Sequence, residues 1–190
     1  MELVVVMAII AILAAMLVPA VNRARKKAAI NKAEAEMASL ASTGGMIYLD
    51  TGYYICLDDY TNTDTSRIYK FTKGTATGKE EKVNDTPNWD GPYTTWQPSQ
   101  IFSSTNGSVL TGTGATWNYT PDTPEASGKE GVDFRYGAPL DPWNHPYCLA
   151  WNNTEEVMVI YSAGPDGIVQ TNAGAVVPAT NSDDLLYKFK

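Results

Sequence analysis

The sequence predicts an α+β protein in which one long N-terminal helix packs on a small antiparallel β-sheet domain with extended loops. Three regions of different composition support this class: an unbroken apolar start, a stretch of strong helix formers, and a remainder rich in Thr, Gly, Asn and Tyr. The 190 residues are enough for one domain of ordinary size. We divide the chain into an apolar helix, an amphipathic helix, a loop-rich insert with short strands and a C-terminal β region, at residues 1–21, 22–51, 52–136 and 137–190.

The first segment is long enough to cross a membrane. Leu3 to Val21 are 19 consecutive apolar or small residues without a charge. At about 1.5 Å per residue they give roughly 28 Å of helix, close to the thickness of a bilayer core. Glu2 stands at the start of this run, where a carboxylate in or near hydrocarbon needs a partner. Pro19, near its end, removes one helix hydrogen bond and marks a weak point.

A basic cluster follows the apolar run directly, at Arg23, Arg25, Lys26 and Lys27. By the positive-inside tendency, these charges place the C-terminal domain in the cytoplasm. The residue composition of that domain favours an exported one instead, so the two signals conflict. The net charge of −7 argues against nucleic acid as a partner.

The second segment continues the helix with alanine, lysine and glutamate, all good helix formers. We expect one helix from about Glu2 to Asp50, with a second weak point at Gly44-Gly45 and a C-terminal cap at Gly52. Alanines and larger apolar residues recur at helical spacing, namely Ala24, Ala28, Ile30, Ala35, Met37, Ala38, Leu40 and Ala41. Small residues permit close packing against copies of the same helix, although helix propensity alone explains the alanines equally well.

The chain has two cysteines, Cys56 and Cys148. An even pair in an exported protein favours a disulfide, for which the loop-entropy model gives roughly 4–5 kcal/mol before strain is subtracted. Two separate buried thiols are the alternative.

The sequence does not predict an enzyme. It contains no phosphate-binding loop, nucleophile elbow or His-Glu-x-x-His helix, and its one histidine, His145, stands in a turn. We expect Trp143 and Tyr147 to pack at a sheet corner.

The opening from Met1 to Ala20 resembles the N-terminus of type IV pilins and of type II secretion pseudopilins, including the spacing of Glu2 and Pro19. Mature chains of that family start with an aromatic, N-methylated residue three places before Met1. The resemblance therefore implies a short preceding piece with a leader that prepilin peptidase removes. It also implies the type IV pilin fold, a Glu2 carboxylate that neutralises the amine of a neighbouring subunit, and local melting over residues 11–19 in the assembled filament.

Three C-terminal motifs resemble the major pseudopilin of type II secretion: the Asp-Pro-Trp element at 141–147, the Ser-x-Gly-x-Asp-Gly turn at 162–167, and the acidic stretch at 181–184. The resemblance implies a calcium loop, and calcium prefers hard oxygen ligands. The candidate ligands are Asp166, Asp183, Asp184 and Ser162. Taken from the residues alone, an ordinary β-turn with two solvated aspartates is the alternative.

The sequence thus predicts a structural subunit that polymerises through its N-terminal helix into a type IV pilin-like helical filament. The C-terminal motifs favour a type II secretion pseudopilus. The Thr-rich insert at 61–131 favours the alternative, a major pilin for adhesion, motility or DNA uptake. A solitary membrane-anchored binding protein is the less favoured reading. The expected partners are identical subunits, the bacterial inner membrane before assembly, prepilin peptidase and the assembly machinery, and the filament is expected to be periplasmic or extracellular.

Overall fold

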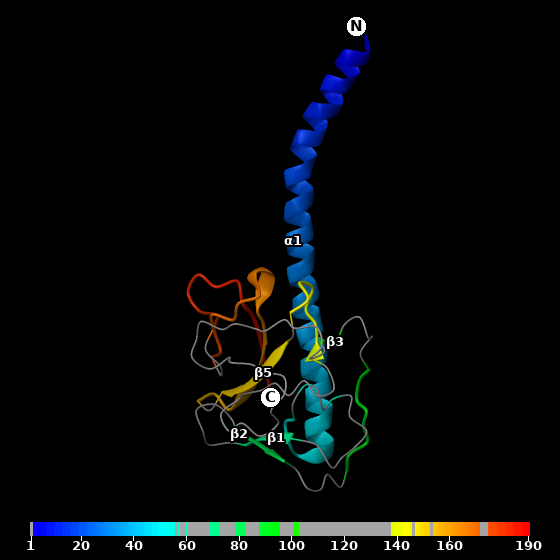
Figure 1. Ribbon diagram of the computed structural model, residues 1–190. Helices are drawn as coiled ribbons and strands as arrows, with labels where there is room; N and C mark the ends of the chain where they lie inside the picture. Colours follow the sequence, from blue (N-terminus) through cyan, green and yellow to red (C-terminus); the bar gives the residue numbers. More distant parts are fainter. Residues whose placement is uncertain are drawn as a thin grey trace.

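A computed structural model shows one long helix beside a small domain, with the N-terminal half of the helix extending beyond it (Figure 1). The structure describes residues 2–55, 57, 60, 69–72, 79–82, 88–95, 101–102, 138–145, 147–152, 154–171 and 175–190. The long apolar helix and a three-stranded antiparallel sheet are compatible with the α+β class expected from the sequence.

Helix α1 spans Glu2–Thr51, 50 residues, and continues through Pro19. It ends at Gly52, which has a positive φ of 76° and donates its N–H to the Tyr48 carbonyl at 2.8 Å. This left-handed cap is the one that glycine adopts without steric cost, and it confirms the predicted end of the helix. Gly44 does not break α1. A Cβ there would overlap the Tyr60 hydroxyl and the Phe189 ring, so the glycine lets the helix approach the domain closely.

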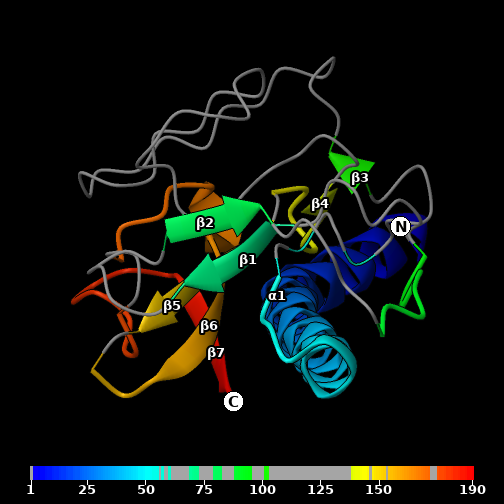
Figure 2. The same ribbon diagram turned by 90° about the horizontal axis from the view of Figure 1, so that it is seen from below.

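The main sheet has three antiparallel strands in chain order, β5 (Cys148–Asn152), β6 (Val157–Ser162) and β7 (Leu185–Phe189). A short 3-10 helix, η5 (Gly164–Asp166), follows β6. Two small antiparallel pairs complete the described strands: β1 (Tyr69–Thr72) with β2 (Lys79–Lys82), and β3 (Ile101–Phe102) with β4 (Ala138–Pro139). Seen from below, α1 lies beside the β5–β7 sheet (Figure 2).

The sheet separates two apolar cores because strand side chains alternate between its faces. On one face, Leu149, Trp151 and Ile160 pack with the buried side of α1. On the other, Cys148, Ala150, Val159 and Tyr161 pack with Val169 and other residues of the C-terminal loops. The helix and these loops therefore cover opposite faces of the same three strands.

Only the C-terminal half of α1 joins the domain. Its buried side recurs every three or four positions, at Ala33, Met37, Leu40, Gly44 and Ile47, and Ala41 is buried beside it. Every residue from Leu3 to Ala28 is exposed. Of the apolar positions expected from the sequence, the domain buries Met37, Leu40 and Ala41 and leaves Ala24, Ala28 and Ala35 exposed.

One pair of matched substitutions tests the packing of α1. Leu40 is 4% exposed in the core, whereas Leu49, on the same helix, is 82% exposed. Leu40→Ala should destabilise the domain by about 2–5 kcal/mol, because it removes buried methyl groups and leaves a cavity. Leu49→Ala should change stability by less than about 0.5 kcal/mol. Chemical denaturation of the full chain in detergent measures both, and equal losses would contradict this packing.

Candidate functional site

The first candidate site is the apolar half of α1. Its large side chains between Leu3 and Val18 are 53% to 74% exposed, so the rest of the described chain does not cover them. Within the described residues, α1 is the one helix long and apolar enough to cross a membrane. Apolar surface of this extent is unfavourable in water by roughly 25 cal/mol per Å², and so it belongs in lipid or against other apolar surfaces.

The two assembly residues expected from the sequence bracket this half. Glu2 is the first residue of α1, and its side chain lies outside what the structure describes. Its pairing with a neighbouring amine stays a prediction. Pro19 lies inside the continuous helix, where it supplies no N–H and leaves a carbonyl of the preceding turn without its usual donor.

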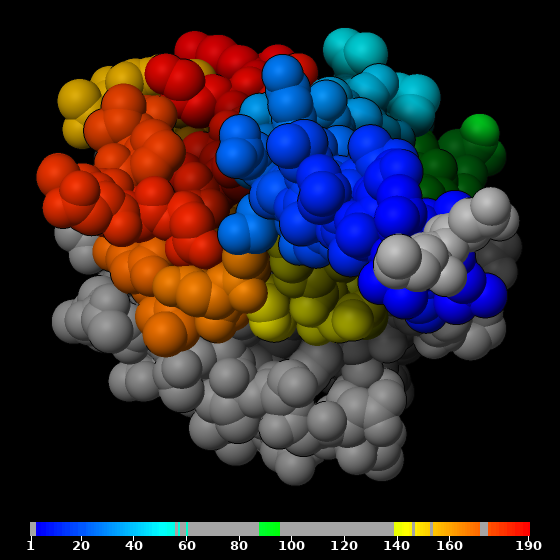
Figure 3. All heavy atoms as spheres, turned by 90° about the horizontal axis from the view of Figure 1, so that it is seen from above, coloured from blue at the N-terminus to red at the C-terminus, as the bar shows by residue number. Residues whose placement is uncertain are grey.

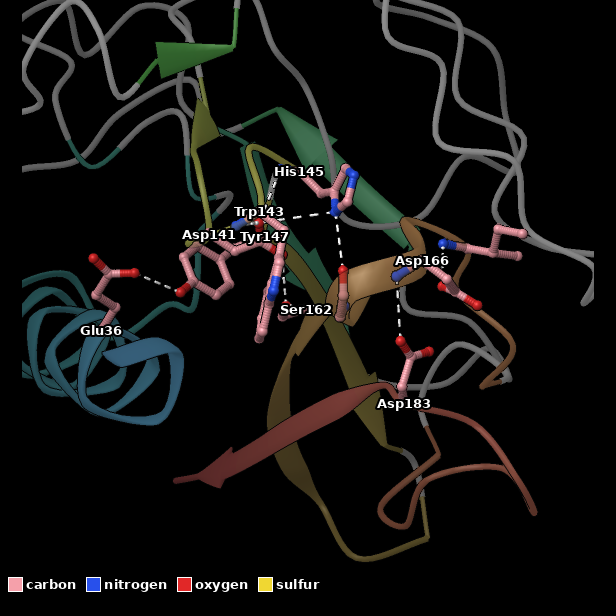
Figure 4. Close-up of polar contacts among 10 residues, drawn as sticks. Glu36, Asp141, Trp143, His145, Tyr147, Ser162, Asp166 and Asp183 are labelled. Carbon is pink, nitrogen blue, oxygen red and sulfur yellow. Dashed lines mark hydrogen bonds and ion pairs between the residues drawn. The ribbon is translucent and has the colours of Figure 1, made fainter. Parts of the chain in front are cut away.

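The second candidate site is a polar network where the 141–147 turn meets the end of β6. Asp141 is 4% exposed, and its carboxylate accepts three hydrogen bonds (Figure 4). Oδ1 accepts the N–H groups of Trp143 at 2.9 Å and His145 at 2.8 Å, while Oδ2 accepts the Ser162 hydroxyl at 2.6 Å. Ser162, expected as a calcium ligand, is therefore directed at Asp141. The sequence did not identify Asp141 as the acceptor at the centre of this network.

His145 joins the same two turns from the other side. Its Nδ1 lies 3.0 Å from the Gly164 carbonyl, which makes Nδ1 the protonated, donating nitrogen. Asn144 has a φ of 66°, a region that asparagine tolerates better than most residues. The turn geometry gives His145 a structural contact, in line with the loop role expected for it.

The expected calcium ligands Asp166, Asp183 and Asp184 lie close together in the chain fold, and each carboxylate already accepts hydrogen bonds. Asp183 Oδ2 accepts the Asp166 N–H at 3.2 Å (Figure 4). Asp166 accepts the Ile168 N–H at 2.8 Å and the Gln170 side-chain amide at 2.6 Å. The first bond ties η5 to the segment before β7, and the other two hold the turn that follows η5.

Asp184 is more deeply placed. It is 4% exposed, and its Oδ2 accepts the N–H groups of Gln170 at 3.1 Å and Thr171 at 2.8 Å, as well as the Thr171 hydroxyl at 2.5 Å. Its Oδ1 and the Gln170 Oε1 are buried, with no hydrogen-bond partner in the described part of the chain. Two buried oxygens without donors are the kind of atoms that a cation would satisfy.

The fit to calcium is nevertheless incomplete. Among the described residues, no three His, Cys, Asp or Glu side chains are arranged to hold a metal ion. The carboxylates of Asp166 and Asp183 and the unpartnered oxygen of Asp184 would have to be joined by main-chain or amide oxygens. Ser162 donates its hydroxyl to Asp141, so the two unpartnered oxygens, Asp184 Oδ1 and Gln170 Oε1, are better candidates for cation ligands than Ser162.

Burial raises the pKa of both Asp141 and Asp184, because the charged form loses hydration, and their hydrogen bonds oppose the shift. A carboxyl whose pKa is higher in the folded than in the unfolded chain costs stability at neutral pH. That cost disappears as the pH falls through the folded-state pKa.

Tyr147 connects the sheet to α1. The residue is 1% exposed, and its hydroxyl donates to Glu36 Oε2 at 2.7 Å (Figure 4). Burial raises the pKa of this hydroxyl, which keeps it a neutral donor. The sequence predicted that Tyr147 packs at the sheet. It could not predict the hydrogen bond to Glu36, because the two residues are 111 positions apart and no local pattern connects them.

Cys148 lies in the second core, and burial raises the pKa of its thiol. Cys56, its expected partner, lies outside the described residues, so the Cys56–Cys148 disulfide stays a prediction.

Comparisons with known proteins did not identify a related protein. Searches of protein-family models, of curated proteins and of solved structures returned no match to this chain. The functional interpretation therefore rests on the residues and on the geometry above.

Ser162→Ala tests the Asp141 network. It removes the hydroxyl that Asp141 Oδ2 accepts, and should destabilise the domain by about 1–3 kcal/mol by leaving a buried acceptor unpaired. Thermal unfolding should show the same loss with calcium and with chelator. Ser39→Ala, at an exposed position of α1, is the control. A loss that vanishes under chelation would assign Ser162 to a metal instead.

Intact mass tests the disulfide. The unreduced chain should be lighter than the reduced chain by two hydrogen atoms. After denaturation without reductant, neither Cys56 nor Cys148 should react with an alkylating agent. Two alkylated thiols in protein prepared from an oxidising compartment would refute the bond.

Proposed function

We propose that this chain is a structural subunit that polymerises through α1 into a type IV pilin-like helical filament, with the type IV pilin fold. The observation that carries the proposal is the uncovered apolar half of a continuous helix whose other half is fixed to a folded domain. Such a helix is stable in a bilayer before assembly. Outside the bilayer, it requires other apolar helices.

The outward face of α1 supports packing of helix on helix. Ala28, Ala35 and Ser42 follow one another at seven-residue intervals and are exposed, whereas Ala33 and Leu40 form the buried side. Positions 33 and 35 differ by about 200° around a helix, so the small residues lie opposite the domain. A face of small side chains allows a second helix to approach closely.

Glu2 provides the polar element of the proposed assembly. A carboxylate at the start of an apolar run costs several kcal/mol in hydrocarbon unless it is paired. An amine on a neighbouring subunit, as in the family that the N-terminus resembles, would neutralise it and set the register of docking. Pro19 marks where the helix would loosen in the packed core.

Two kinds of filament remain. The turns at 141–147 and 162–167 favour a short pseudopilus of type II secretion. The Thr-rich insert favours a surface pilus for adhesion, motility or DNA uptake. A solitary membrane-anchored binding protein is disfavoured, because it would need no small-residue face on the stalk.

A calcium ion is part of the proposal, as a stabiliser of the C-terminal loops. The unpartnered Asp184 Oδ1 and Gln170 Oε1 supply two buried oxygens, and Asp166 and Asp183 lie nearby in the same loop system. Calcium bound there would neutralise part of this negative charge and hold the segment before β7.

Glu2→Gln tests the assembly mechanism. The variant should enter the membrane as well as the unaltered chain, because the apolar run is intact, while its filament yield should fall about tenfold or more. Sedimentation of polymer from membranes measures the yield. Glu34→Gln removes an exposed carboxylate from the same helix and should have no effect. Equal yields from both variants would contradict the pairing.

Chelation tests the calcium site. Adding excess calcium should raise the melting temperature of the unaltered chain, by roughly 3 °C if the ion contributes about 1 kcal/mol. Asp184→Asn should abolish that response, whereas Asp90→Asn, at an exposed position, should keep it. A melting temperature that is the same with calcium and with chelator would contradict the calcium site.

A further inference from the structure

The basic collar of α1, defined as Arg23, Arg25, Lys26 and Lys27, has no role in the function proposed above. All four side chains are exposed, and none takes part in the ion pairs of the described residues. Four positive charges within five residues are concentrated here in a chain whose net charge is −7. Like charges this close repel one another, and an anionic partner would relieve that repulsion.

The collar has a defined direction. Lys26 precedes the buried Ala33, Leu40 and Ile47 at seven-residue intervals, which places it nearly in line with them on the helix. Arg23 lies about 60° from Lys26 around the helix, and Arg25 and Lys27 lie about 100° to either side of it. The collar is therefore centred on the side of α1 that faces the sheet, but beyond the domain. Viewed from above, α1 emerges next to the C-terminal loops (Figure 3). A partner that meets the collar would occupy the space above the domain on that side.

Two aspartates, Asp50 and Asp90, lie near the opposite end of the domain. Asp50, at the end of α1, accepts the Tyr93 hydroxyl at 2.7 Å, and the same hydroxyl accepts the Asp90 N–H at 3.2 Å. The Tyr93 hydroxyl therefore joins the Asp50 carboxylate to the main chain of Asp90, and Asp90 is exposed. The described segments 46–55 and 88–95 contain no Lys or Arg, and the last turn of α1 has no basic residue. The negative end of the helix dipole adds to this charge.

We propose that the basic collar of one copy docks against the Asp50–Asp90 end of a second copy displaced along the helix axis. The two charged sites lie about 25 residues apart on α1, or about 37 Å at about 1.5 Å of rise per residue. Two different surfaces on one chain make a head-to-tail contact, which produces an open helical polymer when the rotation does not close a ring. The inference rests on the proposed filament and names the polar contact that sets its axial spacing.

Charge complementarity favours a second copy over other partners. The Asp50–Asp90 end belongs to the same molecule, faces away from the collar, and carries the sign that the collar needs. It also gives the basic cluster a role that does not depend on which side of the membrane it occupies. Anionic lipid headgroups offer the same negative charge as a carboxylate, and the experiment below separates these two partners.

Charge reversal of the full chain tests the docking. Lys26→Glu and Asp90→Lys should each raise the critical concentration for polymer formation about tenfold, because each places like charges together. The double variant should return to within about threefold of the unaltered chain. Lys190→Glu, an exposed reversal at the other end of the sequence, should change nothing. Polymer is measured by sedimentation after detergent removal.

Three results would overturn the docking. Single variants that polymerise like the unaltered chain, or a double variant worse than either single one, would show that these sites do not meet. A Lys26→Glu chain that polymerises normally but loses binding to phosphatidylglycerol vesicles, relative to phosphatidylcholine vesicles, would assign the collar to lipid. If the unaltered chain itself forms no polymer, the proposed function fails, and the docking fails with it.

Discussion

Nineteen consecutive apolar or small residues at the start of α1 lie uncovered beside a folded domain, and the same helix continues into that domain's core. In a single chain, lipid can cover this apolar surface. In an assembly of many chains, the apolar helices can cover one another, provided that the charge of Glu2 is neutralised. In the proposed filament, this exposed apolar surface accounts for Pro19, for the small-residue face and for the basic collar.

The domain is fixed to α1 by packing and by buried hydrogen bonds. A stripe from Ala33 to Ile47 enters one core, and Tyr147 bonds to Glu36 on the helix. Asp184 holds the C-terminal loops by accepting the main-chain N–H groups of Gln170 and Thr171, and Asp141 holds the 141–147 turn by accepting that of His145. A displacement of the helix would therefore move the whole domain with it.

The sequence predicted the helix well and the polar networks poorly. Helical periodicity and Gly52 predicted the bounds of α1, because both act through local geometry. Whether the domain would cover the Ala28–Ala35 side or the Ala33–Leu40 side depended on residues far along the chain. The hydrogen bonds of Asp141 to Ser162 and of Tyr147 to Glu36 likewise join distant segments. Ser162 was expected to bind calcium because the resemblance of its motif implied a calcium loop, and a motif does not show which acceptor a hydroxyl contacts.

Electron cryomicroscopy of the full chain after detergent removal tests the central claim most directly. The account predicts helical polymers in which the apolar halves of α1 from many subunits form one core around the axis, with the domains outside. Single chains that keep a sheath of detergent or lipid around residues 3–21, with no ordered polymer at any protein concentration, would contradict it.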